Sequence, residues 1–372
     1  MRKIAVLLLV LFQLCLGKSV ENDGDQLVGV AVCYRHGDRA PVASFPNDPY
    51  VDAKYWPDGI GELVNKGKVH QFQLGQWLRR RYKNFLSSRY YPTELFVRST
   101  DVDRTLNSAA SNLAGLYYPD ESPDPVEWPQ DLPWNPVPIH TVSYSDDSVL
   151  AMKKKCENFD KLYKETVDSE YFKNVMKNHT QLKEFVDSKT GWNTTLDLFR
   201  NLWTVLYIYN ETNSSYVPDW ANEINQEELA ELAGLSFSTE TFTPSLQRFK
   251  VGPFFNYLND YFDGILNGTN PKFLMLSAHD GTIASILNTF GDYNYKPPQF
   301  CSTIIWELYR SSAGEPYLNI YFKDGFKTES VVGVKIGNCV SACRYDFYKK
   351  VLINISVDKD SWENECNADK SA

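Results

Sequence analysis

The feature that most constrains the fold is an apolar run that ends abruptly in positive charge. Residues 27–34 are apolar, aromatic or glycine, and Arg35, His36 and Arg39 follow within the next five positions. A short β-rich run bounded in this way predicts a buried parallel strand. In open α/β sheets, ligands bind beyond the carboxyl ends of the strands. The sequence therefore predicts an α/β protein with a cationic site at this strand end.

The residue types in this cluster suit a phosphate ester. Guanidinium forks match phosphoryl oxygens two at a time, and an imidazole between them can attack phosphorus. The alternative is a solvated loop in which the arginines pair with Asp38. Two later apolar runs also end in polar residues, the first in Arg98 and the second in His279 and Asp280. This repetition favours a shared site at the sheet edge.

Three segments carry a family resemblance. Residues 35–41 read Arg-His-Gly-Asp-Arg-Ala-Pro, residues 97–105 read Val-Arg-Ser-Thr-Asp-Val-Asp-Arg-Thr, and residues 277–280 read Ser-Ala-His-Asp. In this order they resemble the signature of the histidine acid phosphatase family, which is the phosphatase branch of the phosphoglycerate-mutase-like superfamily. Together with residues 134–142 and the late cysteines, the resemblance runs from about residue 26 to residue 366.

The resemblance implies a role for each matched residue. His36 is expected to be the nucleophile, and Asp280 is expected to donate a proton to the leaving oxygen. The expected phosphate-binding residues are Arg35, Arg39, Arg98 and His279. We assign Asp101, Asp103 and Arg104 to an ion-pair network that holds their loop.

The expected fold is α/β, with a mostly parallel central sheet flanked by helices and a mainly helical cap inserted. Apolar residues recur at helical spacing between residues 149 and 249, where strand-like alternation is scarce. We therefore expect an α/β phosphatase domain at 18–148 and 250–372 and a helical cap at 149–249. The pattern also predicts helices at 63–86, 106–116 and 281–287. An antiparallel hairpin is expected at 304–309 and 317–322, at the sheet's edge.

Composition limits the partners and the compartment. The formal net charge of −9 argues against a nucleic-acid groove or an anionic membrane surface as the main partner. Residues 1–17 combine a basic start with a short apolar run, which predicts a secretory signal peptide. No later apolar run approaches the ~20 residues of a membrane span. We expect a secreted protein, or a soluble lumenal one of lysosomal type, without a membrane anchor.

An exported chain favours disulfides and glycans. Six cysteines follow the expected signal peptide, and spacing alone does not determine their pairing. The resemblance implies the pairs Cys156–Cys366 and Cys339–Cys343, and the state of Cys33 and Cys301 stays open. Six asparagines begin glycosylation sequons: Asn178, Asn193, Asn210, Asn213, Asn267 and Asn354. Four of them fall between 178 and 213, so that region is expected to face solvent.

These observations predict a secreted acid phosphatase that hydrolyses small-molecule phosphomonoesters through a phosphohistidine. Motifs for nucleotide, dinucleotide, zinc-protease and serine-hydrolase chemistry are absent, so we expect no metal and no cofactor. One alternative is a phytase-like phosphatase, although the acidic balance gives little support for a polyanion pocket. Another is a catalytically retired secreted binding protein on the same fold. A homodimer is possible, and the sequence does not determine the oligomeric state.

Overall fold

A single mixed sheet organises the molecule. The computed structural model describes residues 24–118 and 134–367, so the expected signal peptide lies outside the described residues. Within them the chain forms one seven-stranded sheet in the order β2-β3-β1-β4-β5-β6, with β7 also paired to β5. The strands are β1 (Gln26–Arg35), β2 (Leu95–Ser99), β3 (Phe273–Ala278), β4 (Thr303–Arg310), β5 (Pro316–Lys323), β6 (Val332–Gly333) and β7 (Cys343–Arg344).

The α/β class is confirmed, but the sheet is mixed rather than mostly parallel. Strands β2, β3 and β1 run parallel, as expected, and their carboxyl ends share one edge. The predicted hairpin β4–β5 is present, and β4 pairs antiparallel with β1. Two short strands, β6 and β7, add further antiparallel pairs to β5. The hairpin is therefore joined to the central strand, and β6 and β7 cover its outer edge.

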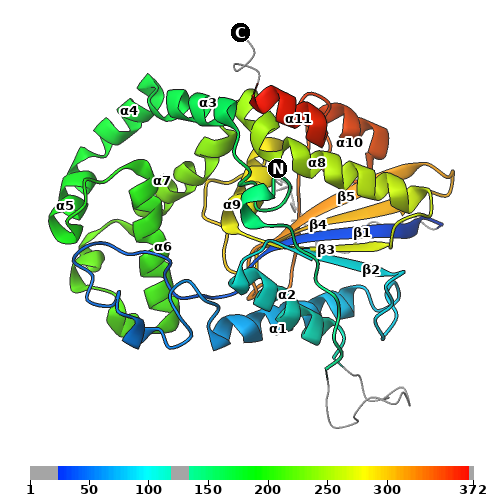
Figure 1. Ribbon diagram of the computed structural model, residues 1–372, viewed down its shortest axis with the longest axis horizontal. Helices are drawn as coiled ribbons and strands as arrows, with labels where there is room; N and C mark the ends of the chain where they lie inside the picture. The colour runs from blue at the N-terminus through cyan, green and yellow to red at the C-terminus, as the bar shows by residue number, and fades with distance from the viewer. Residues whose placement is uncertain (1–23, 119–133, 368–372) are drawn as a thin grey trace, which may run out of the picture.

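Helices cover both faces of the sheet. In Figure 1, α1 and α2 lie below the sheet, α8, α10 and α11 lie above it, and α3 to α7 form a separate group on the left. The bounds are α1 (Asn65–Arg81), α2 (Asp103–Leu116), α3 (Glu157–Val167), α4 (Glu170–Asn178), α5 (Thr180–Thr190), α6 (Leu196–Thr212), α7 (Gln226–Ser238), α8 (Pro244–Leu266), α9 (Asp280–Phe290), α10 (Tyr345–Val351) and α11 (Lys359–Cys366).

Strand β1 shows why the core has two halves. Successive side chains of a strand point to opposite faces. Val30, Val32 and Tyr34 join the core cluster that contains residues of α1 and α2. Ala31 and Cys33 join the cluster that contains residues of α8 and α9. Both faces are apolar because both are covered, as parallel strands in α/β proteins require.

Glycines hold the loop after β1 against the first helix. A Cβ on Gly37 would lie 2.4 Å from the carbonyl oxygen of Gly67, and one on Gly67 would lie 2.1 Å from that of Asp38. Further along α1, a Cβ on Gly75 would lie 1.9 Å from the carbonyl oxygen of Asn112, so α1 and α2 cross in backbone contact. Side chains at these positions would push the loop and the helices apart. The loop that carries His36 is therefore fixed by close packing.

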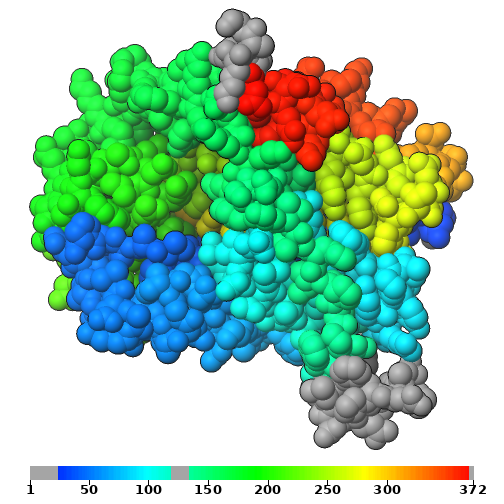
Figure 2. Space-filling model, viewed as in Figure 1, coloured from blue at the N-terminus to red at the C-terminus, as the bar shows by residue number. Residues whose placement is uncertain are grey.

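The helical group at 149–249 is contacted by the chain that follows the first motif. The described residues there form helices α3 to α7 and the start of α8, without a strand. Trp56 stacks on Tyr209 of α6 with ring centroids 5.9 Å apart, and Phe45 packs edge-on against Trp192 at 6.0 Å. Figure 2 shows the blue surface of this early segment directly against the green surface of the helical group. The division into domains stays a prediction.

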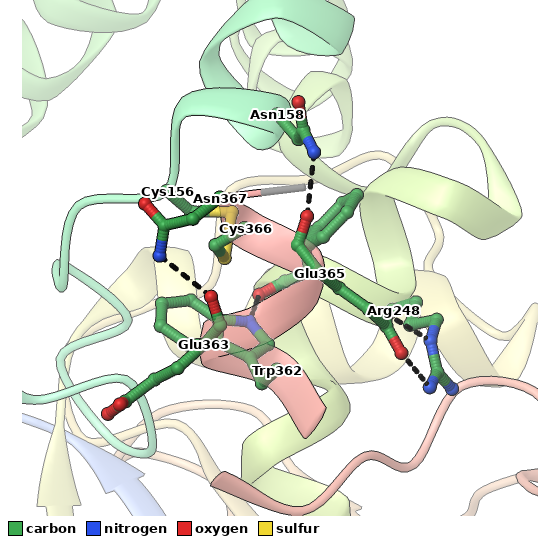
Figure 3. The surroundings of a disulfide bond; sticks show 9 residues. Cys156, Asn158, Arg248, Trp362, Glu363, Glu365, Cys366 and Asn367 are labelled. Carbon is green, nitrogen blue, oxygen red and sulfur yellow. Dashed lines mark hydrogen bonds and ion pairs between the residues drawn. A yellow bond between two sulfur atoms is a disulfide. The ribbon is translucent and has the colours of Figure 1, made fainter. Parts of the chain in front are cut away.

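The two expected disulfides are present. Cys156 bonds Cys366 with their Cα atoms 4.7 Å apart, and Cys339 bonds Cys343. In Figure 3 the first bond joins the residue before α3 to the last residue of α11, beside the Arg248–Glu365 ion pair. Cys33 and Cys301 are free and buried. They belong to the two different core clusters, on opposite faces of the sheet, which explains why they do not pair with each other.

The six sequon asparagines are all exposed, but the region that holds four of them is not uniformly open. Helix α6 buries Phe199, Leu202 and Val205 in the core, so the expectation of a solvent-facing region holds only for part of its surface. Within 24–118 and 134–367, no helix combines the length and the apolar character needed to cross a membrane.

Candidate active site

The carboxyl ends of the three parallel strands bring the three sequence segments together. Arg35 lies opposite Ala278 in the pairing of β1 with β3, and the His36 backbone N–H donates to the Ala278 carbonyl at 3.0 Å. The Thr100 N–H donates to the Ser277 carbonyl at 3.1 Å, which ties the segment after β2 to the same place. The rings of His36 and His279 are 5.8 Å apart between centroids. The predicted convergence of these segments is therefore observed.

His36 presents one free ring nitrogen. Its Nδ1 lies 2.8 Å from the carbonyl oxygen of Gly37. A carbonyl can only accept, so Nδ1 carries the proton and Nε2 is bare. The side chain is buried, and burial together with the charges of Arg35, Arg104 and Arg39 holds the pKa of His36 well below its ordinary value. Burial and these charges therefore favour the neutral imidazole, in which Nε2 is bare.

Arg35 is held from three sides. Nη2 pairs with Oδ2 of Asp280 at 2.8 Å, and Nη1 donates to the carbonyl oxygen of Pro298 at 2.6 Å. The guanidinium carbon lies 4.2 Å from the centre of the Phe300 ring, which is cation–π distance. The side chain is only 1% exposed, and these contacts fix the position of its guanidinium group.

The site contains guanidinium donors that no atom of the described residues satisfies. Nε of Arg35, of Arg39 and of Arg104 is buried without a hydrogen-bond partner among the described residues. Burial and the nearby charge of Arg35 lower the pKa of Arg39 to about 9, and burial lowers the pKa of Arg104 as well. A buried donor without a partner costs about 1–3 kcal/mol, and more for a charged group. Such a cluster is suited to an anion with several oxygens.

Arg98 does not join this cluster. Its Nη2 pairs with Oδ1 of the fully buried Asp147 at 2.7 Å, and its guanidinium carbon lies 5.3 Å from the Tyr257 ring. Arg98 and Phe96 are two apart in β2 and so point to the face of α8, away from Leu95 and Val97. The structure does not support its assignment as a phosphate ligand. Its role is to neutralise Asp147.

Arg104 lies where Arg98 was expected. It is in the first turn of α2, which begins at Asp103 rather than at residue 106. Its charge lowers the pKa values of both His36 and His279, and Asp280 is its strongest acidic neighbour. Asp101 and Asp103 are exposed, and the structure does not show the expected ion-pair network with Arg104. The sequence pattern did not show that the helix begins at Asp103, and this start is what brings Arg104 to the site.

His279 and Asp280 join β3 to α9. His279 is the N-cap residue, and Asp280 is the first residue of the helix, where its Oδ1 accepts from the Gly281 N–H at 2.8 Å. Burial opposes ionisation of Asp280, but the charges of Arg35 and Arg39 outweigh burial and hold its pKa well below the usual range. Asp280 is therefore an ionised partner of Arg35.

Buried polar contacts fix the loop after β1. Gln71 donates to the Arg35 carbonyl at 2.9 Å, and the Gly37 N–H donates to Ser108 Oγ at 3.1 Å. Asp38 pairs with Nδ1 of His70 at 2.7 Å rather than with the arginines. His70 is itself buried against this loop. The loop is thus anchored to both α1 and α2.

An aromatic row leads from the site into the helical group. Phe300 packs against the His36 ring at 5.8 Å, Tyr207 packs against Phe300 at 5.3 Å, and Trp203 stacks on Tyr207 at 5.0 Å. Tyr207 and Trp203 belong to α6. Both side chains are half-buried and pack against the core.

The assembled geometry places two histidines beside a cluster of arginines, and comparisons with known proteins identify the family of the chain. A model of the histidine phosphatase superfamily (branch 2) matches residues 26–323. Lysosomal acid phosphatase of Rattus norvegicus is 32% identical over 368 residues, which is 97% of this chain and 85% of that protein. Prostatic acid phosphatase of Mus musculus is 31% identical over 374 residues, which is 98% of this chain and 94% of that protein.

The chain belongs to the histidine phosphatase superfamily, branch 2, and is a phosphatase. Among solved structures, the apo form of Hafnia alvei phytase superposes with a TM-score of 0.68 and covers 91% of this chain and 98% of its own, at 15% identity. At that identity the likeness shows the fold alone.

Proposed function

We propose that this protein is a secreted acid phosphatase that hydrolyses phosphate monoesters through a phosphohistidine at His36. The observation that carries the proposal is the bare Nε2 of His36 next to three guanidinium groups, each with a buried Nε donor that has no partner among the described residues. A nucleophile and an anion-binding cluster at the same strand ends are what in-line attack on phosphorus requires.

In the first step, Nε2 of His36 attacks phosphorus and the ester oxygen departs. Arg35, Arg39 and Arg104 hold the phosphoryl oxygens and stabilise the charge that they carry while the bonds change. Asp280 protonates the departing oxygen. In the second step, the same carboxylate assists water as it attacks the phosphohistidine, which releases phosphate and restores His36.

Three guanidinium groups and the amino terminus of α9 supply the positive charge that a metal ion provides in other phosphatases. We therefore propose that turnover needs no metal. We also propose export by the signal peptide at 1–17 and glycans on the exposed sequon asparagines, in keeping with the two disulfides. Dimer formation stays a prediction.

The direct test is a substrate panel with the purified protein at acid pH, with and without a chelator. We expect hydrolysis of aryl and alkyl phosphomonoesters, no hydrolysis of a phosphodiester such as bis(nitrophenyl) phosphate, and no effect of the chelator. Preferential hydrolysis of inositol hexakisphosphate would instead identify a phytase. Absence of activity toward every monoester would support the catalytically retired binding protein.

The proton-donor role of Asp280 predicts a leaving-group effect. In Asp280→Asn, we expect kcat/KM to fall by about 10²–10⁴-fold for an alkyl phosphate, because an alkoxide needs a proton as it departs. The loss should be much smaller for nitrophenyl phosphate, whose leaving group is stable as an anion. The measurement is kcat/KM for both substrates with both proteins. Equal losses would show that Asp280 does not protonate the leaving oxygen.

A further inference from the structure

A chain of hydroxyl groups fixes the hydrogen-bonding direction of His279. Nε2 of His279 lies 3.0 Å from Oγ1 of Thr100, which lies 2.7 Å from Oγ1 of Thr105. The Thr105 oxygen in turn lies 2.7 Å from the carbonyl oxygen of Val102. Both threonines are fully buried, so no water competes for these contacts.

The distances determine where each hydrogen lies. Two oxygens come as close as 2.7 Å only when a hydrogen lies between them. The Val102 carbonyl has none, so Thr105 donates its one hydroxyl hydrogen to Val102. Thr105 must then accept from Thr100, and Thr100, whose single hydrogen is used, must accept from His279. Nε2 of His279 therefore carries a hydrogen.

A neutral His279 then has a bare Nδ1. Burial and the charge of Arg104 lower the pKa of His279 to about 3, so the ring stays neutral under mildly acidic conditions. Nδ1 has no hydrogen-bond partner among the described residues. The charged and titratable groups around the ring come from every element that packs on it: His36 after β1, Arg39 in the loop that follows, Arg104 of α2, Tyr144 of the 3₁₀ turn Tyr144–Asp146, Lys153, and Asp280 of α9.

We propose that Thr100 and Thr105 are positioning residues that hold His279 in its Nε2–H form, so that the site selects the phosphomonoester monoanion, whose P–OH group donates to His279 Nδ1. A fully ionised phosphoryl oxygen would face a ring nitrogen that can only accept, and the two lone pairs would repel each other. This inference rests on the proposed function and extends it to the protonation state of the substrate.

The monoanion also balances the protons of the first step. Asp280 is held ionised beside Arg35, so its carboxylate stores no proton for the leaving oxygen. A substrate ROPO₃H⁻ brings one proton with it. When His36 Nε2 bonds to phosphorus, the electron pair of the P–O bond leaves with the ester oxygen. The P–OH proton leaves its hydrogen bond to His279 Nδ1, passes to the carboxylate of the adjacent Asp280 and from there to the ester oxygen, so ROH and phosphohistidine result without a further proton source.

The test compares inorganic phosphate with sulfate as inhibitors of nitrophenyl phosphate hydrolysis. At about pH 5, below the second ionisation of a phosphate, phosphate carries a proton and sulfate does not. We expect phosphate to bind at least about tenfold more tightly than sulfate to the wild-type protein, as one hydrogen bond to a charged group allows. In Thr100→Val the ring is free to donate from Nδ1, so the phosphate-to-sulfate preference should largely disappear, and Thr100→Ser should restore it.

The matched control is Ser99→Ala. Ser99 is also fully buried at the end of β2, but its hydroxyl donates to the Thr100 carbonyl and does not contact His279. The control should keep the wild-type preference. A preference unchanged in Thr100→Val, or lost equally in Ser99→Ala, would overturn the proposal.

A second measurement needs no substitution and no turnover. Nitrogen NMR of the wild-type protein labelled at histidine should show His279 neutral with its hydrogen on Nε2 at about pH 5. A hydrogen on Nδ1, or a charged ring, would contradict the inference even if the protein is an active phosphatase. Conversely, the Nε2–H form in a protein that hydrolyses no monoester would sink the proposed function and leave the hydrogen assignment standing.

Discussion

His36→Ala should abolish turnover, with a loss in kcat on the order of 10⁴-fold or more. The loss is large because the substitution removes the bare Nε2 that lies among the three unsatisfied guanidinium groups, whereas the bare Nδ1 of His279 is assigned to the P–OH group of the substrate. The measurements are steady-state hydrolysis of nitrophenyl phosphate and an acid-quenched reaction with labelled substrate. Label should appear on His36 in the wild-type protein and should be absent from the variant.

His179→Gln is the matched control for this substitution. His179 follows α4 and contacts Glu228 of α7 through Nδ1 at 2.6 Å, in the helical group and outside the site. The substitution keeps the sequon that begins at Asn178. Turnover and labelling should match the wild-type protein. Near-normal turnover in His36→Ala, or label on another residue, would remove the nucleophile assignment.

We expect Arg104→Gln to lower activity without lowering stability, and Arg98→Gln to lower stability. Arg104→Gln should lower kcat/KM by about 10²–10³-fold, the cost of one lost donor to transition-state charge. It should not lower stability, because no hydrogen bond or ion pair joins the Arg104 side chain to another described residue. Arg98→Gln should lower the free energy of unfolding by about 3 kcal/mol, because it leaves Asp147 charged and buried without a cation.

The two variants need both measurements, kcat/KM and denaturant unfolding. Asp147 also accepts hydrogen bonds from the backbone N–H groups of Val149, Leu150 and Ala151. These bonds hold the carboxylate in its buried position when Arg98 is removed. Arg98→Lys should recover part of the stability. A kcat/KM loss in Arg98→Gln as large as that in Arg104→Gln, at equal stability, would restore the original assignment of Arg98.

The strand ends could be predicted because burial dominates them. Strands β1 and β3 are buried on both faces, so they read as continuous apolar runs, and the polar residues that follow them had to lie at one edge. His36, His279 and Asp280 were located in this way. The antiparallel half of the sheet was visible only as a hairpin, because pairing between β4 and β1 leaves no local pattern.

Arg98 shows where the pattern fails. The sequence pattern places it as the first charge beyond a strand, but β2 continues to Ser99, and the alternation of the strand turns Arg98 toward Asp147. Arg104 was missed because helix α2 starts three residues earlier than its apolar spacing indicates. Side chains in the first turn of a helix lean back toward its amino terminus, which here faces the strand ends. Long-range partners such as Asp147 are not readable from spacing.

The bond between Cys156 and Cys366 closes a ring that spans 210 positions, and the catalytic groups are divided by it. His279 and Asp280 are inside the ring, whereas His36, Arg39 and Arg104 precede it. In the unfolded chain such a closure is worth about 5 kcal/mol of lost entropy. Proteolytic nicking at the exposed turn 267–269 would therefore yield two fragments that each carry part of the active site. The disulfide would keep them covalently joined until a reductant cleaves it.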